Sequence, residues 1–134
     1  MAAPTTCVAK PQVRSLVRTL TMTEINASGG TTLINGSPER TITVIDFWTK
    51  AVGATVSGLT TFDLKDNFST PVVVGTCAQA NLTTGVLRAG ASGTVTTNLG
   101  LPLTAGCSLM ASKTGGTAAT ATGLIVGIKY FNSI

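Results

Sequence analysis

The apolar residues of this chain occur in short runs that end at turn residues, and this arrangement excludes folds built from long helices. No stretch of about ten or more residues repeats its apolar side chains with the 3.6-residue period of an amphipathic helix. Threonine is the most frequent residue, and 15 glycines lie within and between the runs. Because β-branched side chains fit a pleated strand and glycine supplies the positive-φ positions of tight turns, the pattern predicts an all-β protein.

About eight short strands are expected between the turns. In the first segment, Leu20 and Met22 alternate with threonines, which is the two-residue period of a half-buried strand. The candidate strand segments are residues 13–25, 31–35, 41–52, 59–64, 72–77, 86–91, 94–99, 107–113 and 120–131, and residues 79–84 are expected to form a single helical turn. Short strands at this spacing, without helical crossovers, predict a β-sandwich or jelly roll.

The length of 134 residues fits one domain. Pro4 and Pro11 favour extended backbone, so residues 1–12 are expected to form an N-terminal arm that reaches a neighbouring subunit, and residues 13–134 a single β-sandwich domain. No apolar run has the length of a membrane helix, and no secretory signal is visible, so we expect a protein made in a cytoplasm and no membrane partner.

The surface predicted from the composition is poor in charge. Only 10% of the residues are charged, and the mean hydropathy is +0.41. A monomer of this composition covers its surface poorly, so we expect a homo-oligomer, a dimer or trimer, in which neighbouring copies bury part of the exterior. The alternative, that Thr and Ser hydroxyls alone keep the surface hydrated, stays open.

The residue types needed for catalysis are scarce, and we expect no enzyme. The chain has no histidine, so a Ser or Cys nucleophile lacks its usual general base. Asp63 and Asp66 are the nearest pair of acids, and we expect them to lie in a turn, where local charge compensation explains them better than glycoside hydrolysis or calcium binding. No catalytic residue is therefore predicted.

The cysteines do not form a metal-binding pattern. Cys7, Cys77 and Cys107 are widely spaced, with no histidine to complete a zinc site. Cys77 and Cys107 have similar neighbours, which leaves open a contact across strands. The simpler interpretation is that they are small buried hydrophobic residues in a reducing compartment. We predict no metal and no cofactor.

A basic cluster near the N-terminus is the first candidate for partner contact. It consists of Lys10, Arg14 and Arg18, and the last two share one face of the predicted strand. The net charge of +4 permits nucleic acid, but no aromatic residues for base stacking are interleaved with these cations. An acidic protein surface is therefore the preferred partner.

Two aromatic pairs supply the other candidates. Phe47 precedes Trp48, and Tyr130 precedes Phe131. Neighbouring residues of a strand point to opposite faces, so one ring of each pair is expected in the core and the other is available for an interface. Trp48 and Tyr130 are the candidate contact residues, and a shallow sugar-stacking site is the alternative use for them.

The strand rhythm and composition resemble those of small virion proteins of tailed bacteriophages. The resemblance rests on LTMTEINASGGT at residues 20–31, TITVI at residues 41–45, LTAGCSL at residues 103–109 and a Thr-, Ala- and Gly-rich final strand. The family members in question are capsid decoration or cement proteins and head-fibre bases.

The resemblance implies a sandwich or jelly-roll subunit that sits on the shell, bridges major capsid subunits and becomes part of the virion after assembly in the host cytoplasm. Two alternatives stay open. One is a small coat protein that assembles a shell by itself. The other is a tail-tip module that binds a receptor or carbohydrate.

Overall fold

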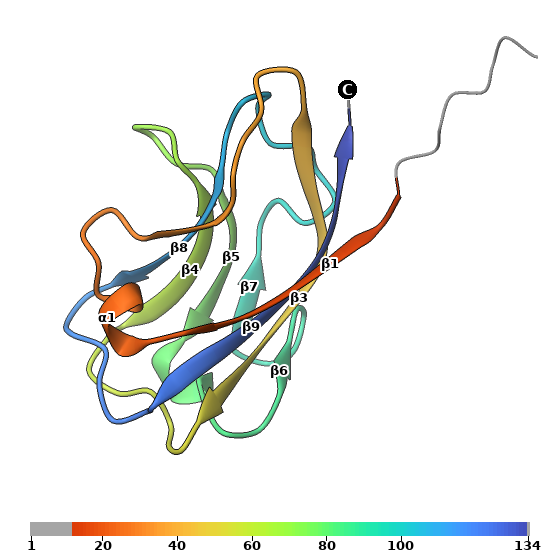
Figure 1. Cartoon of the computed structure of the whole chain (residues 1–134). Helices are drawn as coiled ribbons and strands as arrows, with labels where there is room; N and C mark the ends of the chain where they lie inside the picture. The colour runs from red at the N-terminus through yellow and green to blue at the C-terminus, as the bar shows by residue number, and fades with distance from the viewer. Residues whose placement is uncertain (1–11, 134) are drawn as a thin grey trace, which may run out of the picture.

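A computed structural model describes residues 12–133, which form two antiparallel sheets packed face to face (Figure 1). The predicted all-β class is confirmed, and the two sheets make the fold a β-sandwich. The predicted arm, residues 1–12, lies outside the described residues except for Gln12, and so does Lys10.

Nine strands, one short α-helix and one turn of 3-10 helix make up the described part of the chain. The elements are β1 (Arg14–Leu20), α1 (Met22–Ile25), β2 (Thr31–Ile34), β3 (Thr41–Val52), β4 (Thr61–Asp66), β5 (Val73–Ala78), η1 (Gln79–Asn81), β6 (Leu87–Arg88), β7 (Thr94–Thr96), β8 (Leu109–Thr114) and β9 (Gly123–Ser133).

The strand order identifies the sandwich as a jelly roll. One sheet has four strands in the order β1-β9-β3-β6, and the other has five in the order β2-β8-β4-β5-β7. The antiparallel pairs β1 with β9, β2 with β8, β3 with β6 and β4 with β5 are nested, as if one long hairpin had been folded across both sheets. This nesting is the pairing of an eight-stranded jelly roll, and β7 is an additional strand at the edge.

The core lies between the two sheets and follows the alternation of the strands. On β9, Leu124, Val126 and Ile128 are buried, whereas the residues between them face away from the core. Phe47 of the four-stranded sheet reaches Gly75 of the other sheet, where a Cβ would lie 2.6 Å from two carbons of the ring. The absence of a side chain at Gly75 therefore lets the largest buried ring of the four-stranded sheet seat against the facing backbone.

The prediction of a strand over residues 13–25 was wrong in its second half, where α1 forms. The backbone N–H of Glu24 donates to Oγ1 of Thr21 at 3.1 Å, and the backbone N–H of Thr21 donates to Oε1 of Glu24 at 3.1 Å. This is a capping box, which satisfies two donors at the start of a helix. It places Ile25 in the core with no exposed surface, and the alternation of threonines was misleading because the cap decides the local conformation.

Two further predicted strands are much shorter in the structure. The strands expected over residues 86–91 and 94–99 shrink to β6 and β7, because glycines at positive φ turn the chain at Gly90, Gly93 and Gly100. The helical turn expected over residues 79–84 is present as η1.

Candidate interaction surface

The outer face of the four-stranded sheet carries a row of residues, one from each strand. Val17 of β1 lies opposite Gly127 of β9, which lies opposite Trp48 of β3, which in turn lies opposite Arg88 of β6. Because neighbours in register share a face, these four positions cross the whole sheet on its solvent side. In the next row, Ile125 of β9 lies beside the same stretch of β3.

Trp48 is at the centre of this row. A Cβ on Gly127 would overlap the indole ring, so the ring lies across the β9 backbone at that residue. Trp48 and Ile125 are half-buried, whereas Val17 is 62% exposed. We call Val17, Trp48, Ile125 and Gly127 the Trp48 patch. It is an apolar surface formed by three strands on the side of the sheet that faces away from the core.

Cations surround the Trp48 patch. Lys50 lies opposite Ile125, Arg88 lies opposite Trp48, and Lys129 lies opposite the single acid of this region, Asp46. Within residues 12–133 the only ion pair is Arg18 with Glu24, so none of the three cations is held by a carboxylate there. The patch thus combines an apolar centre with a positive rim, which suits a partner surface that is apolar and acidic.

Trp48 was predicted from the sequence as a contact residue, and its pair behaves as the strand alternation requires. Phe47 is 1% exposed and belongs to the core, while Trp48 faces outward. Tyr130 lies outside the patch. It sits in register between Arg14 and Val44 and packs partly against the core, and Phe131 is also half-buried.

The two predicted arginines share the other side of β1, the side that carries the buried Leu20. Arg18 bonds to the carboxylate of Glu24 and donates from Nη1 to the carbonyl oxygen of Thr32 at 2.8 Å. Its guanidinium group therefore ties β1 to α1 and β2 and is largely satisfied within the fold. Arg14 is exposed at the start of the strand, so the structure brings neither of these two arginines onto the Trp48 patch.

The acids expected in a turn lie instead on β4, and this prediction was wrong. Asp63 is 8% exposed and accepts hydrogen bonds from three threonine hydroxyls, at 2.9 Å from Thr76 and 2.8 Å from Thr114. Asp66 is fully buried and accepts from the backbone N–H groups of the following loop. Each carboxylate is therefore held by a separate set of hydrogen-bond donors. The described residues form no cluster of three or more potential metal ligands.

The two described cysteines are separate, buried thiols. Cys77 of β5 lies opposite Phe62 and Thr94, so it does not face Cys107, and both are free. Burial raises the pKa of the Cys77 thiol above its ordinary value of 9.0, with the carboxylate of Asp63 adding to the effect. The interpretation as small buried hydrophobic residues therefore agrees with their placement.

Replacement of Cys77 by alanine is expected to reduce the loss of stability at alkaline pH. Because the pKa is raised in the folded state, the folded protein holds this proton more tightly than the unfolded chain does. This difference adds to the stability of the folded protein. The added stability is fully present below about pH 9 and is lost as the pH rises through the folded-state pKa. Urea-unfolding midpoints of both proteins from pH 7 to pH 10 measure the effect, and parallel curves would contradict it.

The fold by itself leaves the function open, because jelly rolls serve unrelated purposes and function depends on the surface. Among the described residues, no helix has the length and apolar character needed to cross a membrane. No family model, no curated protein and no solved structure matches this chain.

Proposed function

We propose that the protein is a structural virion protein of a bacteriophage, which decorates the capsid and stabilises it by bridging major capsid subunits. The Trp48 patch is the observation that carries the proposal, because a partly exposed apolar surface with a positive rim is typical of a binding face. The jelly roll supports it further, since viral capsid domains commonly use this architecture.

Trp48 is suited to be the anchor of such an interface. Tryptophan is enriched among residues that dominate binding energy, and these residues sit near the centre of the contact. The ring already rests on the backbone at Gly127, so little side-chain freedom is lost on binding. Lys50, Arg88 and Lys129 then direct the face towards acidic loops of the shell and raise the rate of encounter.

The mechanism of stabilisation is linkage. A protein that binds the assembled lattice, but not free capsid subunits, stabilises the lattice by RT ln(1 + [L]/Kd) at each site. Many copies on one particle add their contributions, so even weak sites produce a shell that resists heat or internal pressure. We expect the free protein to be a dimer or trimer.

A tail-tip module that binds carbohydrate is the second candidate, and one observation favours it. Trp48 is half-exposed beside Arg88, and an open aromatic ring with a neighbouring donor is the arrangement that stacks a sugar. A coat protein that assembles by itself is the third candidate. Light scattering of the purified protein separates a discrete oligomer from spontaneous shells.

The test is co-sedimentation of the purified protein with empty capsids of its source phage. Trp48→Ala is expected to weaken binding about thirtyfold, the loss typical of a binding hot spot. Val17→Ser is expected to weaken it less. Val95→Ser is the matched control, because Val95 is 59% exposed, close to the 62% of Val17, but lies on β7 in the other sheet.

If Trp48→Ala still binds capsids as tightly as the wild type and melts at the same temperature, the Trp48 patch is not the surface that contacts the capsid. Wild-type protein that stays in the supernatant and instead binds glycans would support the tail-tip module. Equal losses in Val17→Ser and Val95→Ser would mean that binding depends on general surface hydrophobicity rather than on this face.

A further inference from the structure

Among the described strands, β1 has the longest unprotected edge. The four strands at the edges of the two sheets are β1, β6, β2 and β7. β6 and β7 have only two and three residues, and β2 has four with a register shift among them. β1 has seven residues, contains no proline and pairs with β9 without any shift (Figure 1). Because short length and bulges normally prevent edge pairing, β1 is the edge on which another strand can dock.

The hydrogen bonds of β3 show which backbone groups of β1 face this edge. The carbonyl oxygen of Phe47 accepts, at 2.8 Å, from the N–H of the residue that follows β6, on the side of β3 away from β9. Successive residues of a strand direct their N–H and C=O groups to alternate sides, so those of Trp48 face β9 and meet those of Gly127. Val17 lies opposite Gly127 on the other side of β9, and its own groups are therefore turned to the free edge.

Three residues of β1 thus present backbone groups to solvent. Ser15, Val17 and Thr19 share this direction by alternation. Within residues 12–133 their N–H and C=O groups have no backbone partner on the free side, and all three residues are exposed. Arg18 does not guard the edge with its charge, because its guanidinium group is bonded to the carboxylate of Glu24. The edge is therefore accessible to a second strand.

The charges of β1 select one register for antiparallel pairing with a second copy of the chain. A twofold axis at Val17 lets the outward groups meet and places Arg18 opposite Leu16 of the partner subunit. Moving the axis by one residue towards the N-terminus places Arg18 opposite Arg14 of the partner subunit. Moving it by one residue the other way places Arg18 opposite its own copy. Since like charges directly opposite are destabilising, the register centred on Val17 is favoured.

We propose that a second copy of this chain docks on the edge of β1, so that the two four-stranded sheets join into one continuous sheet across a twofold axis at Val17. Identical edges that pair antiparallel close after two copies, so the product is a dimer. Val17 belongs to the Trp48 patch, and the patches of the two copies therefore form one row. With strands about 4.8 Å apart, the two Trp48 positions lie roughly 24 Å apart along the joined sheet.

The dimer deepens the proposed function, and its role in bridging rests on that function. Residues opposite each other across paired strands share a face, so both Trp48 patches point to the same side of the joined sheet. The partner that this surface fits is a pair of acidic, partly apolar sites on neighbouring capsid subunits. Once one patch is bound, the other meets its own site at a high effective concentration. A dimer can therefore bridge two subunits with two identical contacts.

Sedimentation velocity of the full chain, without capsids, tests the dimer. We expect a monomer–dimer equilibrium that shifts to the dimer as the protein concentration rises. Ser15→Pro removes an N–H that faces the free edge and none that bonds to β9. The twofold axis repeats this loss, so dimerisation should weaken about tenfold to hundredfold. Ser15→Ala is the matched control, because it removes the hydroxyl group but keeps the N–H.

Val17→Lys tests the position of the axis. It places two ammonium groups opposite each other at the centre of the contact, and we expect it to weaken dimerisation at least about tenfold. Val95→Lys is the matched control, because Val95 is 59% exposed and lies on β7, an edge strand of the other sheet. The melting temperature of each variant shows whether it is folded.

Amide hydrogen exchange of the wild-type protein reads the same edge without a substitution. The amides of Leu16 and Arg18 face β9 and should be protected at every protein concentration. Those of Ser15, Val17 and Thr19 should gain protection only at concentrations at which the dimer forms. Exchange at these three amides that does not change with concentration would contradict pairing through β1.

A protein that stays monomeric at every concentration, a trimer, or a dimer that survives both Ser15→Pro and Val17→Lys would overturn the proposal. Co-sedimentation with capsids is measured separately. A dimer that shows the expected losses but ignores capsids would support the edge pairing and contradict the proposed function. A monomer that binds capsids would do the reverse.

Discussion

Replacing Phe47 by alanine is expected to lower the free energy of unfolding by about 3–5 kcal/mol, the range for truncating a buried phenylalanine. Phe47 is 1% exposed and is the ring of the four-stranded sheet that reaches the backbone of the other sheet at Gly75. Its loss leaves a cavity between the layers, and the surrounding strands cannot collapse into it without giving up their hydrogen bonds. Urea unfolding followed by Trp48 fluorescence measures the change.

The reciprocal substitution tests the same contact from the other sheet. Gly75→Ala is expected to cost about 1–3 kcal/mol, because its Cβ would lie 2.6 Å from two carbons of the Phe47 ring. In the double variant Phe47→Leu/Gly75→Ala, the shorter leucine leaves room for the new Cβ. The double variant should therefore lose less free energy of unfolding than Phe47→Leu and Gly75→Ala lose together. Additive losses, or a Phe47→Ala variant within 1 kcal/mol of wild type, would contradict this account of the sheet contact.

The class of fold could be predicted from the sequence because it depends on local pattern. Short β-branched runs between turn residues permit strands and little else. Alternation predicts that Phe47 and Trp48 point to opposite faces, but a bulge between Val44 and Asp46 decides that Phe47 is the buried ring. The segment after Leu20 could not be read in the same way. There, a capping box between Thr21 and Glu24 competes with the alternation of threonines, and the cap decides the local structure.

The candidate surface was only partly predictable, because it depends on pairing between distant strands. Trp48 was visible as an aromatic on an exposed strand face, but Val17 and Ile125 join it only through the registers of β1 and β3 with β9. A sequence without aligned relatives does not give those registers. Arg18 was singled out for its charge, and the structure shows that its guanidinium group contacts Glu24 at the local turn formed by α1.

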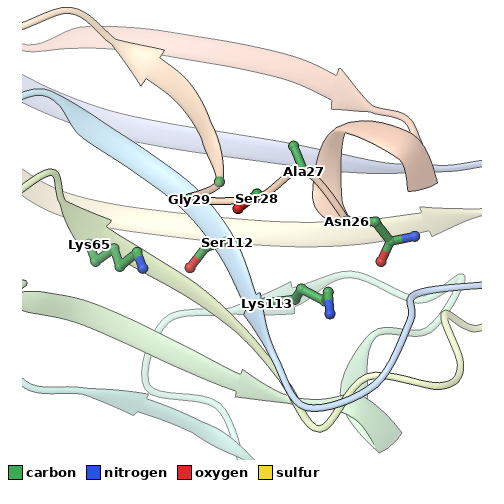
Figure 2. A pocket seen from close by; sticks show the side chains of 8 residues that line it. Asn26, Ala27, Ser28, Gly29, Lys65, Ser112 and Lys113 are labelled. Carbon is green, nitrogen blue, oxygen red and sulfur yellow. The ribbon is translucent and has the colours of Figure 1, made fainter.

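A polar pocket of about 200 Å³ lies on the five-stranded sheet (Figure 2), and it was missed for a related reason. This polar pocket is lined in part by Lys65 and Lys113, which are far apart in the chain and come onto neighbouring strands because β4 pairs with β8. Neither residue belongs to a charge cluster in the sequence, so no local signal marks them. The loop between the segments predicted at residues 13–25 and 31–35 is held in place by Asn26, whose side chain bonds to Ala118 across the fold.

Replacing Asp66 by alanine is expected to cause the second large loss of folding stability. The residue is fully buried at the end of β4, and its Oδ1 accepts from the backbone N–H groups of Phe68 and Val72, both at 3.1 Å. A carboxylate that accepts from two backbone donors closes the loop between β4 and β5. Asp66→Ala removes both bonds and leaves a cavity, and we expect it to lower the free energy of unfolding by about 2–4 kcal/mol.

Asp66→Asn separates the hydrogen bonds from the charge. The amide oxygen of asparagine can still accept from Phe68 and Val72, while the NH2 group takes the place of Oδ2, which is buried without a hydrogen-bond partner among the described residues. Since the substitution keeps both accepted bonds, removes a buried charge and only exchanges one unpaired polar group for another, Asp66→Asn should lose about 1 kcal/mol or less. Hydrogen exchange at the amides of Phe68 and Val72 reports the loop directly: protection should fall in Asp66→Ala and persist in Asp66→Asn. Equal losses of stability in the two variants would mean that the charge itself, rather than the acceptor at Oδ1, holds this loop to the sheet.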